Sequence, residues 1–458
     1  MAISIAAPID FAANSDMLAE AIEAIERLGT RSGGAVDAPV RRRALERYRS
    51  FGRAPLISPR WRHDYAALSF DELQWTSGRI DVPTSVASGT ARAPGASSGD
   101  APALAVENSG GLVHAGSIYL QPPETADSER VVLCSLADAK RARRAQVEAV
   151  QQHVVAADAD RFAALATAFQ NCGAYIEIPD GCRLDAPLQL VWSARPGAPA
   201  AVFPHTVVRV GAGAHATVVE RHVGESSAFI CGIVEIDVAP GGRLDYVVVQ
   251  QADDGARLLF SRGARCAPGA TVGWHLAELG GALVRTALSS HLNNPHARAE
   301  TNAFFFARGF AHVDLITDIA HDAPHTVART SVRSAATDRG QGRFTGAIRV
   351  HAAAKGCDAT MRDDALMLSR SAYLDAVPAL EISSNDVSVS HAATVGTLDE
   401  EQLFYVQSRG ISRAGAERIV ALAFFEPVLS GFPGETLRDE VRTALDTHLE
   451  EIPETFAS

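Results

Sequence analysis

Alternating apolar and polar residues, the pattern of half-buried β-strands, dominate the chain from Ala174 to about Val395. Extended runs such as TVVRVGAGAHATVVERHVG and AFICGIVEIDVAPGGRLDYVVVQQ are separated by turns rich in Gly, Asp, Asn and Pro. This stretch is long for a single β-sandwich, and small residues recur before its turns, so the pattern favours a β-solenoid over a sandwich or a barrel. We expect about nine or ten coils of roughly 20 to 25 residues each.

Apolar residues at spacings of three and four predict helices before this region. The predicted helices are residues 13–30, 39–51, 137–155 and 157–173. Gly173 is the expected C-terminal stop of the last of them. Residues 84–111, rich in Ala, Gly, Ser and Pro, predict a loop or a mobile linker.

Helical patterns return at the C-terminal end of the chain. Thr397 and Glu400 are spaced as a capping box, which predicts the start of a helix. A second helix is expected from Ser412 to Pro427, with one aromatic side chain exposed at its end, and a third from about Thr436 to Leu449. The pattern divides the chain into three expected domains: 1–173, 174–396 and 397–458.

The strand that ends the extended region carries the best candidate for chemistry. Its alternate positions Val387, Val389, His391 and Ala393 share one face, so His391 is predicted on the apolar side of the strand. An imidazole in that place is most often a hydrogen-bonded core or interface histidine. It can also be a ligand, because neutral imidazole suits iron. Periodicity alone leaves both interpretations open.

Composition narrows the functional classes. The net charge of −12 argues against a surface for nucleic acid or anionic membranes. The sequence shows neither a secretory signal nor a membrane-spanning apolar run, so we expect a cytoplasmic protein. Its six cysteines form no CxxC pair, which predicts free thiols and no zinc or stable cluster site of standard spacing.

Motifs for familiar chemistries are missing. There is no GxxxxGK[ST], HExxH or GxSxG sequence, so we expect neither ATP hydrolysis nor zincin or serine-hydrolase chemistry. Carboxylates and imidazoles are dense in one segment, at His312, Asp314, Asp318, His321, Asp322 and His325. They could hold a metal, but the polar outer face of a strand is the preferred interpretation. Cys357 is a candidate thiolate with nothing nearby that would lower its pKa.

The segment DVSVSHAATVGTLDEEQLFYVQSRGIS resembles the C-terminal signature of the SufB/SufD family of iron–sulfur cluster assembly proteins. In that signature, a strand with a histidine and an ATVG turn precedes an LDEEQLFY helix entry. AYIEIPDGCRLDAPLQLVW and SPRWRHDYAALSF resemble two further family segments. The resemblance covers about residues 160–450 and implies a right-handed parallel β-helix flanked by N-terminal and C-terminal helical regions.

Two differences from the SufB sequence pattern indicate the SufD branch of the family. Asp363 stands where SufB carries a functional cysteine, and Ala392 stands where SufB has a glutamate after the strand histidine. The SufD branch typically has cysteine and serine before that histidine, whereas this chain has Val389 and Ser390. A thiol of that branch is therefore missing here.

The resemblance implies a non-catalytic scaffold that supports de novo cluster assembly. It would pair with SufB through the strands near His391, with Val387, Val389, His391 and Ala393 as interface candidates. It would dock the SufC ATPase, which hydrolyses ATP, on the C-terminal helices, with Ile419, Phe424, Phe425, Glu426 and Pro427 as candidates. A transient iron–sulfur cluster at the SufB–SufD interface would take His391 as one ligand, as histidine can replace cysteine on iron.

Alternatives stay open at this point. The chain could be a SufB-like or self-associating scaffold, since an isolated copy could form a homodimer through the same strands. It could instead be a polysaccharide-active β-helix enzyme, which would share the solenoid and place paired carboxylates along a groove. The C-terminal helices could equally be a small self-contained subdomain.

Overall fold

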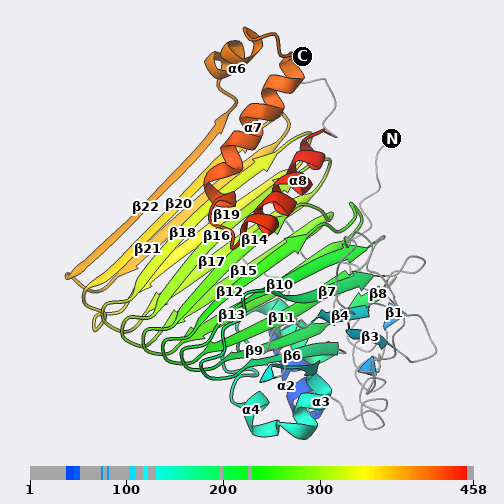
Figure 1. The fold of residues 1–458 in the computed structure, drawn as a ribbon, viewed down its shortest axis with the longest axis vertical. Coiled ribbons are helices and arrows are strands. Elements are labelled where there is room, and N and C mark those ends of the chain that lie inside the picture. Colours follow the sequence, from blue (N-terminus) through cyan, green and yellow to red (C-terminus); the bar gives the residue numbers. More distant parts are fainter. Residues whose placement is uncertain are drawn as a thin grey trace.

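The computed structural model is drawn in Figure 1. The structure describes residues 38–51, 74–75, 80–81, 104–108, 117–121, 130–170, 172–194, 200–224 and 229–450. The helix predicted at 13–30 and the segment SPRWRHDYAALSF lie outside these residues. Most of the predicted linker at 84–111 also lies outside them, although Leu104–Asn108 within it form strand β3.

Successive strands alternate between two sheets, so that each turn of the chain contributes one strand to each sheet (Figure 1). The first sheet contains β5 (Val132–Ser135), β6 (Cys172–Ile178), β9 (Pro204–Val210), β11 (Phe229–Val238), β13 (Arg257–Cys266), β15 (Leu283–Leu292), β17 (His312–His321), β19 (Gln341–Val350) and β21 (Tyr373–Ile382). Two short strands attach to it, β8 (Ala200–Val202) and β1 (Gln74–Trp75).

The second sheet receives the other strands. It contains β2 (Ile80–Asp81), β3, β4 (Ser117–Gln121), β7 (Leu188–Ala194), β10 (His215–Gly224), β12 (Arg243–Gln250), β14 (Thr271–Glu278), β16 (Arg298–Ala307), β18 (Val327–Ala336), β20 (Cys357–Met367) and β22 (Val387–Thr397). From β7 to β22, every neighbouring pair is parallel. The expected parallel β-helix, flanked by helices, is confirmed.

The repeat is longer than predicted. In the second sheet, paired positions in successive turns are 27 to 31 residues apart, as shown by His215, Arg243, Thr271, Arg298, Val327, Asp358 and Ser388. The solenoid therefore has about seven turns, and the expectation of nine or ten shorter coils was wrong. From β10 to β22, most strands are ten residues long, and two strands with their two corners make one turn.

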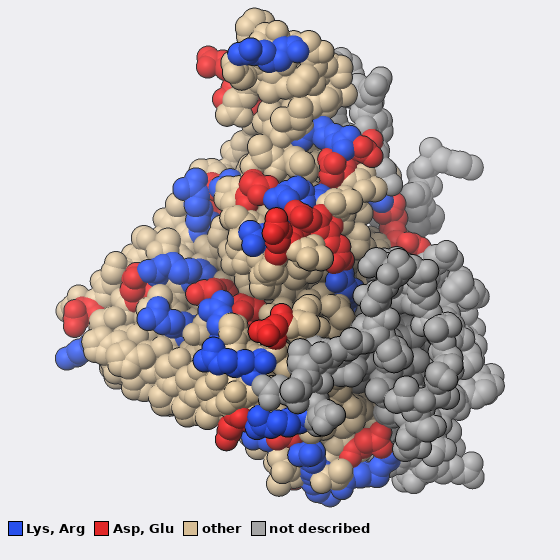
Figure 2. All heavy atoms as spheres, viewed as in Figure 1, with Lys and Arg blue, Asp and Glu red and all other residues tan. Residues whose placement is uncertain are grey.

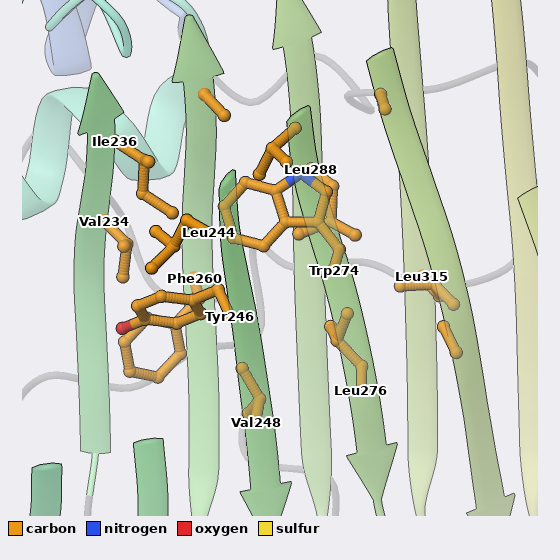
Figure 3. Close-up of a cluster of buried hydrophobic side chains, with 14 of the residues drawn as sticks. Val234, Ile236, Leu244, Tyr246, Val248, Phe260, Trp274, Leu276, Leu288 and Leu315 are labelled. Atoms are coloured by element: carbon orange, nitrogen blue, oxygen red, sulfur yellow. The ribbon is translucent and has the colours of Figure 1, made fainter. Parts of the chain in front are cut away.

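The core lies between the two sheets and runs the length of the solenoid. Trp274 and Tyr246 are fully buried there, with ring centroids 5.6 Å apart in an edge-to-face arrangement. Figure 3 shows them among aliphatic side chains from both sheets, including Leu288 and Leu315. Because each turn buries its apolar face on its neighbours, stability accumulates turn by turn.

Helices α2 (Ala38–Ser50), α3 (Leu136–Ala142), α4 (Arg144–Glu148) and α5 (Arg161–Phe169) form the N-terminal helical part. The helix predicted at 137–155 is thus two short helices. Gly173 was wrongly predicted as a helix stop, because it lies within strand β6. A Cβ there would come within 2.3 Å of the His205 carbonyl oxygen, so close strand pairing requires the glycine.

Two carboxylates, buried Glu235 and partly exposed Asp160, fasten this part to the outer face of the first sheet. Glu235 on β11 accepts hydrogen bonds from the backbone N–H groups of Val154 at 2.9 Å and Val155 at 3.1 Å, and it lies 2.8 Å from Nε2 of His205. Asp160 caps α5 and pairs with Arg285 of β15 at 2.7 Å. These contacts join the N-terminal helical part to strands β11 and β15.

Helices α6 (Glu400–Gln407), α7 (Arg413–Leu429) and α8 (Glu435–Glu450) follow β22. Helices α7 and α8 cover the outer face of the second sheet, where Phe425 of α7 packs on Phe304 of β16 at a centroid distance of 5.3 Å. No described helix is both long and apolar enough to cross a bilayer. The division into domains at 173/174 and 396/397 stays a prediction.

The start of α6 differs from the predicted capping box. Asp399 is the N-cap, and its carboxylate accepts a hydrogen bond from the Glu401 N–H at 2.8 Å. Thr397 still belongs to strand β22, which continues past Gly396. Glu400 pairs instead with Arg413 of α7 at 2.7 Å.

Charges of both signs are interspersed over the described part of the face in Figure 2. Several pair between turns, as Arg265 does with Asp237 of the neighbouring turn at 2.8 Å, and Arg243 does with Glu300 two turns away at 3.2 Å. Exposed pairs of this kind contribute little to stability individually. They do neutralise charge along the stacked strands.

Candidate functional site

The solenoid ends at β21 and β22, the last strands of the two sheets. Each pairs on one side only, β21 with β19 and β22 with β20. No described segment pairs with their other edges. Such an edge presents unpaired backbone N–H and C=O groups and is a template for another strand.

His391 lies in the middle of β22, on the interior face of this last turn. It is in register with Met361 of β20, whose side chain is fully buried in the core. In a parallel pair, registered residues point to the same side of the sheet. His391 is nevertheless exposed, because no described turn stacks beyond it. Its imidazole has no hydrogen-bond partner among the described residues.

The other three interface candidates extend this face. Val387 and Val389 are half-buried and pack against the solenoid core, whereas Ala393 is exposed. Val395, at the same parity, is 46% exposed. The four predicted residues thus lie together on one strand, whose interior face is half-buried at its start and exposed further along.

Asp363 is the most unusual buried group near this end. It lies on the interior face of β20, is 1% exposed, and neither carboxylate oxygen has a hydrogen-bond partner among the described residues. Burial, together with the neighbouring charge of Asp364, raises the pKa of Asp363 to about 7, against the opposing effect of Arg333. In the sequence, Asp363 stood out only as a departure from the SufB pattern, although its parity with Met361 and Ala365 could have revealed an acid that points inward.

The next residue has the opposite environment. Asp364 points to the outer face, 3.0 Å from Arg333 and 2.7 Å from Arg362, and accepts a hydrogen bond from the Thr394 hydroxyl. Burial alone would raise the pKa of Asp364, but these donors and the charge of Arg333 lower it below the usual value. Two adjacent carboxyls therefore differ in protonation behaviour because one faces the core and the other faces arginines.

A groove of about 400 Å³ lies between the end of β22 and helices α6 and α7. Its lining is mainly apolar and includes Val395, Leu398, Val420 and Phe424. Asp399 is the single carboxylate among its lining residues. The groove is therefore shaped for apolar contact, and it has no carboxylate pair for glycoside hydrolysis.

The predicted SufC-contact residues are distributed over different environments of α7. Ile419 is 46% exposed and Pro427, which lies inside the helix, is exposed. Glu426 pairs with Arg442 of α8 at 2.7 Å. Phe424 is half-buried beneath the Arg333 guanidinium, and Phe425 is fully buried.

Two exposed aromatic residues of α6 were not singled out from the sequence. Phe404 is 73% exposed and Tyr405 is 61% exposed, both on α6. They lie in the LDEEQLFY motif, where the signal was two adjacent aromatics in a helix whose only buried residue is Leu403. Figure 1 shows α6 at one tip of the molecule, beside the start of α7.

The carboxylates and imidazoles of the described segment around β17 do not converge on one point as a group of three or more. Asp314 and Asp318 lie on the outer face of the first sheet, as the preferred interpretation expected, while His321 points inward. The Nδ1 atom of His321 is 2.7 Å from the Thr326 hydroxyl, and burial lowers the pKa of His321 to about 4. No group of three or more possible metal ligands occurs among the described residues.

All six cysteines are free, as predicted. Cys357 is buried, with its Sγ atom 3.1 Å from the Thr326 hydroxyl. Burial and the nearby Asp138 raise the pKa of Cys134 to about 11, and burial with Asp237 raises that of Cys266 to about 12. With these raised pKa values, the thiols of Cys134 and Cys266 are protonated at neutral pH and are poor metal ligands in this state.

Comparison with known proteins agrees with the resemblance in the sequence. Residues 192–424 match the family described as SUF system FeS cluster assembly, SufBD core domain, and this match covers half of the chain. The chain belongs to the SufB/SufD family. The matched region begins in β7 and ends in α7, so it includes both last strands of the solenoid.

Individual SufB/SufD relatives are more distant. The chain is 28% identical over 279 residues to the iron–sulfur cluster assembly protein SufB of Bacillus subtilis, which covers 60% of each chain. It is 27% identical over 304 residues to a SufBD family protein of Staphylococcus saprophyticus, 65% of each chain. A SufBD family protein of Mycobacterium leprae is 28% identical over 264 residues, 57% of this chain and 30% of that protein. The chain thus spans between about a third and two thirds of the length of these relatives.

Proposed function

We propose that this chain is the SufD-type scaffold subunit of a cytoplasmic SUF complex, pairing with a SufB protein while an iron–sulfur cluster is assembled between them. The observation that best supports the proposal is the position of His391 at the open end of the solenoid. This residue is exposed, without a hydrogen-bond partner among the described residues, on the interior face of a turn that nothing described covers.

The geometry of the open end supports pairing with another β-helix. A second solenoid that placed its own last strands against β21 and β22 would satisfy their edge groups and extend both sheets. Val389 and Ala393 would then be covered in the same way as the interior residues of earlier turns. The imidazole of His391 would be enclosed between the two proteins, facing the partner's end.

His391 would supply one ligand to a transient cluster, which is the cargo of the complex. Neutral imidazole binds iron and can replace a thiolate at a cluster. Val389 and Ser390 bring no thiol beside it, so the remaining ligands would come from SufB. We expect no cofactor in the isolated chain.

The C-terminal helices would dock the SufC ATPase, which would hydrolyse ATP, so this chain itself would not be an enzyme. Exposed Ile419 and Pro427 on α7 support such a surface, with Glu426 at its rim. Phe424 and the buried Phe425 would hold the helix on the second sheet. Exposed Phe404 and Tyr405 on α6 enlarge the apolar area.

The pairing is tested by co-expressing the chain with the SufB and SufC proteins of its own genome and measuring complex mass by light scattering. A charge on the open edge should block pairing, so Ala393→Lys should elute without SufB. Ala156→Lys, an exposed substitution between α4 and α5 in the N-terminal helical part, is the matched control and should keep the complex. An intact complex in Ala393→Lys would contradict pairing through β22.

A self-associating scaffold is the second candidate, because the same open edge could pair with a copy of itself. The same light-scattering measurement on the isolated chain distinguishes it. A homodimer that Ala393→Lys converts to monomer, without any SufB complex, would favour this alternative.

A further inference from the structure

One row of corners in the solenoid is built to a common plan. At each corner, a residue with φ near +60° donates its backbone N–H to a carbonyl of the next corner. Gly213, Gly241 and Gly269 do so to Pro240, Pro268 and Pro295, each at 3.0 Å. His296 and His325 do so to Pro324 at 3.3 Å and Lys355 at 2.8 Å, and Gly356 does so to Asp386 at 2.7 Å.

Two consecutive corners therefore have histidine where the others have glycine. Their φ angles are 63° for His296 and 58° for His325, a left-handed conformation that costs a residue with a Cβ about 1 kcal/mol relative to glycine. Glycine is sufficient for the turn at this position of the corner, as the four glycine-containing corners show. The side chains at these two corners are thus not required by the turn.

The two imidazoles lie side by side. Their ring centroids are 5.3 Å apart and their planes differ by 8°. The common backbone conformation gives both side chains the same direction, and the strand spacing of about 4.8 Å sets their separation. The next corner leaves room for this arrangement, because a Cβ at Gly356 would lie 2.5 Å from Nδ1 of His325.

Both side chains are exposed, and neither ring has a hydrogen-bond partner among the described residues. Their nitrogen lone pairs are therefore available to a ligand. Lys355, also exposed at this row of corners, carries a charge that disfavours a cation, whereas exposed Asp322 favours one. No third protein ligand stands with the two imidazoles in the described residues, so water would complete the coordination.

We propose that His296 and His325 form a binding site for one divalent first-row transition-metal ion. Neutral imidazole is the ligand that such ions share, and small rotations of two exposed side chains bring their nitrogens to one ion. Affinity for a site of this kind should rise from iron(II) to nickel(II) and copper(II). The site is separate from His391 and does not depend on the proposed pairing with SufB.

The test uses the full-length protein without a polyhistidine tag, titrated with Ni²⁺ in a calorimeter. We expect one Ni²⁺ per chain, at least tenfold weaker binding in His296→Gly and in His325→Gly, and no binding at this site in the double variant. X-ray absorption at the nickel edge should show two imidazole ligands in the wild type. His351→Ala, which removes an exposed histidine near the same corners, should bind Ni²⁺ as the wild type does.

The glycine variants keep the test independent of folding. Glycine occupies the equivalent place in neighbouring corners, so each variant should unfold at the same temperature as the wild type or higher when no metal is present. Unchanged Ni²⁺ affinity in the double variant would overturn the proposal. An absorption spectrum that lacks two imidazole ligands in the wild type would also overturn it.

Discussion

His391 on β22 lies in register with Met361 on β20, yet Met361 is fully buried and His391 is exposed. The two side chains occupy the same row of the solenoid interior, one turn apart. Their difference in exposure comes only from position, because Met361 has another turn stacked on it and His391 has none described. An interior position at an open end is well suited to hold a group that a partner must reach.

The first prediction concerns the cap of α6. Asp399→Ala should lower the free energy of unfolding of the C-terminal helices by about 1 kcal/mol, because its carboxylate satisfies the Glu401 N–H. Hydrogen exchange of α6 amides would measure the effect. Thr397→Ala, the residue first expected to cap this helix, should change exchange little. Faster exchange in Thr397→Ala than in Asp399→Ala would contradict the cap seen here.

The second prediction concerns the fastening of the N-terminal helical part. Glu235→Gln keeps the shape of the side chain but removes the negative charge of the carboxylate, which accepts hydrogen bonds from the Val154 and Val155 N–H groups. Hydrogen bonds to charged groups contribute about 1.5–3 kcal/mol, so limited proteolysis near residues 150–155 should become faster. Glu381→Gln, an exposed change on the same sheet, is the control. Equal cleavage rates in both variants would show that Glu235 does not fasten this segment.

The third prediction is a pH dependence set by Asp363. Its pKa in the folded protein is raised to about 7, compared with about 3.9 in an unfolded chain. Between these values the folded state binds the extra proton, so the free energy of unfolding falls as pH rises from about 4 to about 7. The shift corresponds to a loss of up to about 4 kcal/mol.

Urea unfolding of Asp363→Asn checks this prediction. Asparagine cannot ionise, so the variant should gain stability relative to the wild type as pH rises, and the difference should level off above about pH 7. Asp364→Asn is the contrasting control, because its carboxylate is held ionised by arginines and its loss should destabilise the protein at neutral pH. A difference between Asp363→Asn and the wild type that does not vary with pH would refute the assignment.

Some of this structure was predictable from local pattern. The period of two from Ala174 onward predicted strands and, with the length of the region, favoured a solenoid, whereas the parallel β-helix was implied by the family resemblance. The parity of His391 with Val387 and Val389 placed it on the interior face. The number of turns was not predictable, because the strand lengths alone do not show that each turn contains two strands, one in each sheet. The exposure of His391 also depends on which turn is last, a property of the stack and not of the strand.

Two other features depended on contacts between distant residues. Gly173 looked like a helix stop but is required by its approach to the His205 backbone in the next turn. The lack of a hydrogen-bond partner for the Asp363 carboxylate could be recognised only once the surrounding side chains of the interior were placed. His296 and His325 stack because they are 29 residues apart, which is one turn of the solenoid here. The length of the turns was too irregular to be read from the sequence alone.

The most direct test of the central claim is anaerobic reconstitution of the complex with SufB and SufC, followed by an absorption spectrum. In His391→Ala, the complex should keep its mass and stability, since an exposed substitution changes stability by about 0.5 kcal/mol or less. Its cluster absorbance should fall well below that of the wild type, whereas the exposed control His351→Ala should keep full absorbance. Equal cluster absorbance in His391→Ala and the wild type would contradict a ligand role for His391.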